Sequence, residues 1–192
     1  MLNLLFPKVC MGCKQLLLKG EDVLCLNCIH ALPIASFHKS GNDLLKNKFY
    51  GRFIVENATS IIYFQKRGLA QELLHNLKYR GKKEISTFFG KWLGAELAEM
   101  DTYKNIDIVI PVPLHKQKLK KRGYNQVEGF GKEIAKALQI TYRDDVLIKI
   151  SKSNSQVFKT RLLRFEAEEV FTIQNLDAIA NKHVLLVDDI IT

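Results

Sequence analysis

The sequence contains no apolar run that approaches the ~20 residues needed for a membrane-spanning helix. It also lacks the core of a signal peptide, because Pro7 and Lys8 end the apolar stretch 1–6 too early. Internal repeats and low-complexity tracts are missing as well. We therefore expect a cytoplasmic protein that does not insert into membranes.

Acidic residues are scarce relative to basic ones, since 20 Asp and Glu stand against 29 Lys and Arg, for a formal net charge of +9. This excess favours polyanionic partners, either nucleic acid or a substrate rich in phosphate. A generally basic protein without a specific anion site is the alternative, and only the position of the cations can decide between the two. The hydrophobic fraction of 47% is typical of a globular protein, and 192 residues allow one ordinary domain with a small additional module.

Cysteine does not occur after residue 28, and all four cysteines fall into two Cys-x-x-Cys pairs. The first pair is Cys10 and Cys13, and the second is Cys25 and Cys28. Two such pairs can present four thiolates to one tetrahedral zinc ion, and four thiolates leave no open position for catalysis. Two disulfides or buried free thiols are the alternatives, although a reducing cytoplasm disfavours disulfides. We predict a double zinc ribbon-like module over residues 1–35, which a structural zinc ion stabilises directly.

The rest of the chain alternates apolar, strand-like runs with segments of helical periodicity. Alternation of this kind predicts an α/β fold with a mostly parallel sheet. We expect strands over residues 58–64, 106–110, 146–150 and 183–187, and helices over residues 69–79, 83–100 and 125–138.

Two of the predicted strands end in residues that can carry chemistry, and ligands of open α/β sheets bind outside the carboxyl ends of the strands. One strand leads into residues 111–115 (PVPLH) and a cationic run over 116–122, and the last leads into Asp188 and Asp189. Each feature has a structural alternative. Acids after a strand can belong to a solvated loop or a helix N-cap, and a lysine run can be a solvated surface.

Several segments together resemble the ComF family and occur in that family's order. They are PVPLH (111–115), RGYNQ (122–126), LKYRG (77–81) and the N-terminal cysteine pairs. Residues 184–192 resemble the opening of the phosphoribosyl-diphosphate loop of type I phosphoribosyltransferases. The resemblance implies a zinc-binding module followed by a phosphoribosyltransferase-like domain, here over residues 36–192. Members of the family are associated with natural competence and uptake of single-stranded DNA, and are often labelled amidophosphoribosyltransferase-like.

The resemblance also implies roles for individual residues. Asp188 and Asp189 would be catalytic, because their carboxylates accept hydrogen bonds from the ribose hydroxyls and support the positive charge that develops at C1. Residues 116–122 and the adjoining residues 123–126 would form a mobile hood whose cations neutralise the leaving diphosphate, with Mg²⁺ bridging its oxygens. The residues expected to bind phosphoribosyl diphosphate are Pro111, Val112, Pro113, Leu114, Lys116, Arg122, Asp188, Asp189 and Thr192.

The LKYRG segment has two interpretations of equal weight. It can be a functional motif of the family. It can also be a helix C-cap, with Gly81 at the end of the helix and with Lys78 and Arg80 facing the helix dipole.

Two features depart from the family's pattern. Ala167 stands where the family usually has Asn after an aromatic–Glu pair, and the chain stops after Thr192, inside the ribose-phosphate loop. We therefore expect weak or absent binding of phosphoribosyl diphosphate, and an exposed apolar surface beside residues 184–187.

Three functions agree with these observations. The first is transfer of 5-phosphoribosyl to an unknown acceptor with release of diphosphate. The second is a binding module that holds phosphoribosyl diphosphate, a nucleotide or single-stranded DNA without turnover and serves the competence machinery. The third is a non-catalytic, zinc-containing nucleic-acid-binding module in which the acidic pair is incidental.

Overall fold

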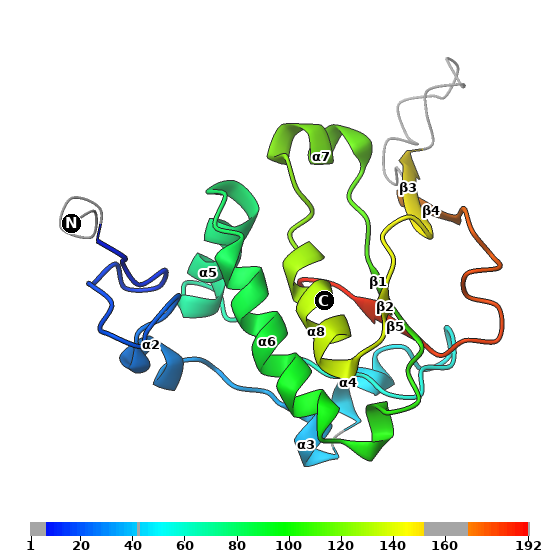
Figure 1. The fold of residues 1–192 in the computed structure, drawn as a ribbon, viewed down its shortest axis with the longest axis horizontal. Helices are drawn as coiled ribbons and strands as arrows, with labels where there is room; N and C mark the ends of the chain where they lie inside the picture. Colours follow the sequence, from blue (N-terminus) through cyan, green and yellow to red (C-terminus); the bar gives the residue numbers. More distant parts are fainter. Residues whose placement is uncertain (1–6, 42, 152–168, 192) are drawn as a thin grey trace.

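The computed structural model describes residues 7–41, 43–151 and 169–191, and it has an α/β architecture (Figure 1). Its central sheet holds three parallel strands in the order β2-β1-β5. They are β1 (Ile108–Pro111), β2 (Thr141–Tyr142) and β5 (Val184–Val187). Because β1 lies between the other two strands, all of its residues are buried. The predicted α/β class and parallel sheet are thus confirmed for these three strands.

Seven α-helices and one short 3-10 helix occur in the described part of the chain. They are α2 (Leu26–His30), α3 (Phe37–Ser40), α4 (Leu44–Asn47), α5 (Leu69–Tyr79), α6 (Glu84–Ala98), η1 (Asp101–Tyr103), α7 (Lys116–Arg122) and α8 (Glu128–Leu138). The predicted helices over 69–79, 83–100 and 125–138 are therefore confirmed as α5, α6 and α8, with ends that shift by up to three residues. Figure 1 shows α6 and α8 side by side.

Two glycines of α6 allow this helix to approach α8 closely. A Cβ atom at Gly90 would lie 2.6 Å from the backbone oxygen of Phe130, and one at Gly94 would lie 2.9 Å from the Cβ atom of Ala137. Since α8 packs in turn against β1 and β2, the α6–α8 pair is held in place against the sheet.

Two apolar clusters connect the parts of the molecule. One lies between the sheet, α6 and α8, and includes the fully buried Leu97, Val109 and Ile134. The other joins the cysteine region to α5 and α6 and includes Cys10 and Leu73. The N-terminal module therefore shares apolar core with the helices that flank the sheet.

The predicted strand at 146–150 exists, but it lies outside the parallel sheet. It forms β3 (Leu147–Ser151), which pairs antiparallel with β4 (Glu169–Ile173) in a separate two-stranded sheet. Apolar periodicity reports that a segment is extended, whereas the partner of a strand is chosen by the rest of the fold. The direction of this pairing was accordingly not predicted.

The predicted strand at 58–64 is wrong. The segment forms only an isolated antiparallel bridge between Ile34 and Ile62, with hydrogen bonds from Ala35 N to Ile61 O and from Tyr63 N to Pro33 O, each of 2.8 Å. Pro33 has no N–H with which to extend a ladder, so the pairing stops there.

An apolar surface lies exposed at β5, as the sequence predicted. Val184 and Leu186 are 41% and 57% exposed. Among the described residues, β5 is an edge strand of the three-stranded sheet. Among the described helices, none is both long and apolar enough to cross a membrane.

Candidate functional site

The four cysteines converge on one point. The Sγ atoms of Cys10, Cys13, Cys25 and Cys28 all lie within 4.8 Å of one another, and the four thiols are free. The sulfur atoms of Cys13 and Cys25 are 3.7 Å apart, which is far longer than the ~2.05 Å of a disulfide. A tetrahedral ion with metal–sulfur bonds of ~2.3 Å places its sulfur ligands about 3.8 Å apart. The cluster therefore fits a metal ion such as zinc.

Tight local turns bring the cysteines together. The first turn is closed by hydrogen bonds from Cys10 N to Gln15 O at 2.8 Å and from Lys14 N to Cys10 O at 3.0 Å. In the second pair, Cys25 is the N-cap residue of α2, so Cys28 faces inward from the first turn of that helix. The backbone N–H of Cys25 donates to Cys10 Sγ at 3.3 Å, which joins the two pairs.

The electrostatics of the cluster favour a cation. Burial works against ionisation of Cys10, but backbone hydrogen bonds, the largest from Cys25, lower the pKa of Cys10 to about 6. Burial and then the neighbouring thiols, Cys10 first, raise the pKa of Cys28. Several thiolates in so small a space repel one another, and a bound metal ion compensates that repulsion.

A second candidate site lies where β1 and β5 end. Pro111 pairs with Val187 in the sheet, and Val112 N donates to Val187 O at 2.9 Å. The turn after β1 and the acids after β5 therefore emerge side by side, as predicted from the two strand ends. Asn125 Nδ2 donates to Val112 O at 3.0 Å, so the RGYNQ segment reaches the same edge.

The two acids differ in their surroundings. Asp189 N donates to Asp188 Oδ1 at 2.7 Å. The Asp189 side chain is only 6% exposed, and its Oδ1 forms an ion pair with Lys78 Nζ at 2.9 Å. Its buried Oδ2 has no hydrogen-bond partner among the residues that the structure describes. One carboxylate oxygen at the end of β5 is thus left for a further donor.

The pKa of Asp188 is raised above its ordinary value. Partial desolvation of the carboxyl group is the main cause, although the residue as a whole is exposed, and the negative charge of Asp189 adds to it. The hydrogen bond from Asp189 N and the charges of Lys78 and Lys149 oppose the rise. A carboxylate that the fold does not fully stabilise is typical of functional sites.

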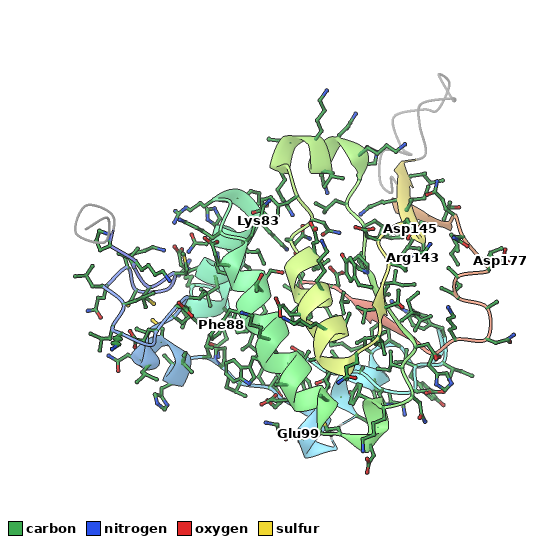
Figure 2. All side chains as sticks on the ribbon, in the orientation of Figure 1. Lys83, Phe88, Glu99, Arg143, Asp145 and Asp177 are labelled. Carbon is green, nitrogen blue, oxygen red and sulfur yellow. The ribbon has the colours of Figure 1, made fainter. Side chains whose placement is uncertain are left out.

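The cationic run over 116–122 is helix α7, and all seven of its residues keep contact with solvent. Several side chains of this helix project away from the rest of the molecule in Figure 2. His115 caps the helix, because its Nδ1 accepts from Gln117 N at 3.3 Å. The predicted site residues Lys116 and Arg122 stand at the two ends of α7, and Lys116 is exposed.

The end of α7 is tied to α5. Arg122 hydrogen-bonds Gln126 Oε1 and lies over the Tyr79 ring at 5.8 Å. Tyr124 Oη donates to Leu77 O. The RGYNQ and LKYRG segments, which are far apart in sequence, therefore lie against each other.

Lys78 was named from the sequence only as part of LKYRG, and it was not among the expected site residues. Within LKYRG, Arg80 Nη1 turns back along α5 to Glu72 Oε1 at 3.1 Å and Asn76 Oδ1 at 3.0 Å, and Gly81 takes a positive φ of 71°. The positive φ of Gly81 matches the helix-cap interpretation, whereas Arg80 binds side chains of α5 instead of the carbonyl groups at its end. Lys78 also departs from that interpretation and crosses to Asp189, a partner that no local pattern in the sequence signals.

A hollow of about 190 Å³ opens between the N-terminal ends of α6 and α8. Its two lysines already engage protein groups: Lys83, labelled in Figure 2, lies 4.7 Å from the centre of the Tyr124 ring, and Lys132 pairs with Glu128 at 2.5 Å. The edge formed by β1 and β5 is the stronger candidate for a ligand, because a buried carboxylate oxygen there has no partner among the described residues.

Thr192 and Ala167 lie outside the described residues, so the start of the expected phosphate turn and the basic segment before β4 have no structural description. Comparison of the sequence with models of protein families finds no match, and comparison with curated proteins finds none either.

Proposed function

We propose that this chain is a ComF-like protein of phosphoribosyltransferase type, whose site at the ends of β1 and β5 binds phosphoribosyl diphosphate. The observation that carries the proposal is the buried Oδ2 of Asp189, which has no partner in the described part of the chain and follows the strand that pairs with Pro111. The motif resemblance supports it independently, because the same two segments carry the site in that family.

The chemistry of the ligand suits this arrangement. Vicinal ribose hydroxyls donate to Asp188 and Asp189, and the carboxylates stabilise the positive charge that develops at C1 when its bond to diphosphate breaks. The leaving diphosphate takes the bonding electron pair, and an acceptor forms the new bond at C1. Residues 111–114 would lie against the diphosphate, with Lys116 and Arg122 supplying positive charge and Mg²⁺ accompanying the ligand. The acceptor is not identified by any segment of the chain.

The cysteine cluster has a structural role in this proposal. A zinc ion held by Cys10, Cys13, Cys25 and Cys28 would be fully coordinated by protein, so it would stabilise the N-terminal module and take no part in the transfer.

A titration followed by backbone amide NMR tests the proposal, because it detects weak binding. With phosphoribosyl diphosphate and Mg²⁺, we expect weak binding, with shift changes centred on the amides of Val112, Leu114 and His115 and on those of Asp188 and Asp189. Asp188→Asn and Asp189→Asn should abolish them, whereas Asp177→Asn, on the exposed loop labelled in Figure 2, should not. Shift changes absent from the unmodified chain, or unaltered in both site variants, would refute the proposal.

A nucleic-acid-binding module is the second candidate, favoured by the net charge of +9 and by the solvated cations of α7. In the same experiment, single-stranded DNA would bind with a steep salt dependence, and binding would survive loss of both acids.

A further inference from the structure

An ion pair joins α5 to the end of β5. Lys78, in the last turn of α5, places Nζ 2.9 Å from Asp189 Oδ1. The Asp189 side chain is 6% exposed and the Lys78 side chain 23% exposed, so the pair is largely removed from solvent. Removing one partner of such a pair leaves an uncompensated buried charge, which is far more costly than losing a surface ion pair.

The backbone that carries Lys78 is held on both sides. Asn76 Nδ2 donates to Met11 O at 2.8 Å, within the first cysteine turn, and Leu77 O accepts from Tyr124 Oη. Leu73 and Leu77 are 1% and 6% exposed in the cluster that includes the cysteines. The lysine therefore projects from a fixed position between the cysteine module and the RGYNQ segment.

The ion pair engages only one of the two carboxylate oxygens of Asp189. Lys78 occupies Oδ1 of Asp189, while Oδ2 stays buried and unpartnered among the described residues. Lys78 also places a positive charge close to two adjacent carboxylates, which otherwise repel each other. A carboxylate whose rotamer is set by one oxygen presents the other oxygen in a defined direction.

We infer that Lys78 is a positioning residue of the candidate ribose-phosphate site: it orients Asp189 so that Oδ2 accepts a hydroxyl of the ligand. The inference rests on the proposed function and deepens it. Lys78 acts through Asp189 and through charge, without contact to the reacting atoms.

The test measures the affinity of the whole chain for phosphoribosyl diphosphate with Mg²⁺. We expect Lys78→Ala to weaken binding at least about tenfold and Lys78→Arg to recover most of the loss, because a guanidinium also reaches a carboxylate. Lys82→Ala changes an exposed lysine four residues further along and should leave affinity unchanged.

The pH profile separates positioning from a purely structural role. The charged groups that act on the Asp188 carboxyl are Asp189, Lys78 and Lys149. The charge of Lys78 favours the ionised form of Asp188. As pH is lowered, Asp188 of Lys78→Ala should therefore become protonated first. The variant should lose binding at a higher pH than the unmodified chain does.

Three outcomes overturn the inference in distinguishable ways. Lys78→Ala that unfolds more easily but binds with unchanged affinity and pH profile shows a structural ion pair only. Loss of affinity that Lys78→Arg does not recover at all contradicts a role through charge. Failure of the unmodified chain to bind refutes the proposed function itself, and the inference with it.

Discussion

At the scale of the residue, the folded protein disfavours the ionised form of the Asp188 carboxyl group. Partial desolvation, and then the charge of Asp189, raise the pKa of Asp188 above its ordinary value. The folded state therefore binds this proton more tightly than the unfolded chain does. The resulting contribution to stability is fully present below the ordinary carboxyl pKa and is lost as pH rises through the raised pKa. At neutral pH the fold therefore favours the ionised side chain less than the protonated one, by an amount that solvent screening of the exposed Asp188 keeps small.

Asp188→Asn should for that reason increase the free energy of unfolding near neutral pH, because the amide keeps an oxygen for Asp189 N and removes the charge. The gain should shrink as pH falls towards about 4, where the unfolded carboxyl also becomes protonated. Urea denaturation at a series of pH values measures this difference.

Asp101→Asn is the matched control, because the pKa of Asp101 is shifted in the opposite direction to that of Asp188. A hydrogen bond and the charge of Lys104 hold the pKa of Asp101 below its ordinary value, so its contribution exists at neutral pH and is lost as pH falls. Asp101→Asn should not stabilise the protein at neutral pH. If Asp188→Asn behaved in the same way, the raised pKa of Asp188 would be contradicted.

At the scale of the element, the α6–α8 contact depends on the absence of side chains at two positions. Gly90 faces the backbone of Phe130 with room for no Cβ atom, and backbone cannot move aside as a flexible side chain can. The close contact fixes α8, whose N-terminal end follows directly after the RGYNQ segment.

Gly90→Ala should destabilise the protein although alanine is the better helix former by roughly 1 kcal/mol. The steric cost of overpacking, about 1–3 kcal/mol, is expected to exceed that gain. Chemical denaturation measures the net change in the free energy of unfolding from both effects. Lys91→Ala, at an exposed position on the same helix, should change stability little. A Gly90→Ala protein that is more stable than the unmodified one would show that the helices separate easily.

The same scale explains the predicted strand that did not form. Residues 58–64 have the composition of a strand, but their neighbour contains Pro33 and offers a single bridge. Residues 147–151 do form a strand, although with an antiparallel partner. Composition decides whether a segment can be extended, and the availability of N–H donors in the neighbour decides whether a ladder forms.

At the scale of the whole molecule, α5 connects the cysteine module to the acidic pair. One of its faces packs on the cysteines and hydrogen-bonds Met11 O through Asn76, and its last turn reaches Asp189 through Lys78. A metal ion that stabilises the cysteine module should therefore also stabilise α5.

Removal of zinc by a strong chelator should lower the midpoint of thermal unfolding. It should also speed amide hydrogen exchange in residues 9–28 and in α5 before it does so in β1. Added zinc should restore both properties, whereas Mg²⁺ should not, because thiolates prefer the softer ion. A protein that contains no zinc as isolated, and whose stability is unchanged by zinc or chelator, would contradict the metal assignment.

The sequence by itself determined the features that depend on short-range spacing. The two cysteine pairs, the helical periodicities of α5, α6 and α8, and the apolar runs of β1 and β5 were all predicted, because each arises from residues a few positions apart. That the segments after β1 and β5 leave the sheet at the same edge was also predicted, since ligands of open α/β sheets bind at the carboxyl ends of the strands. The tertiary structure alone decided the partners: β3 with β4, and Lys78 with Asp189. Such partners come from distant parts of the chain, and burial and charge choose between them only once the helices and strands have packed.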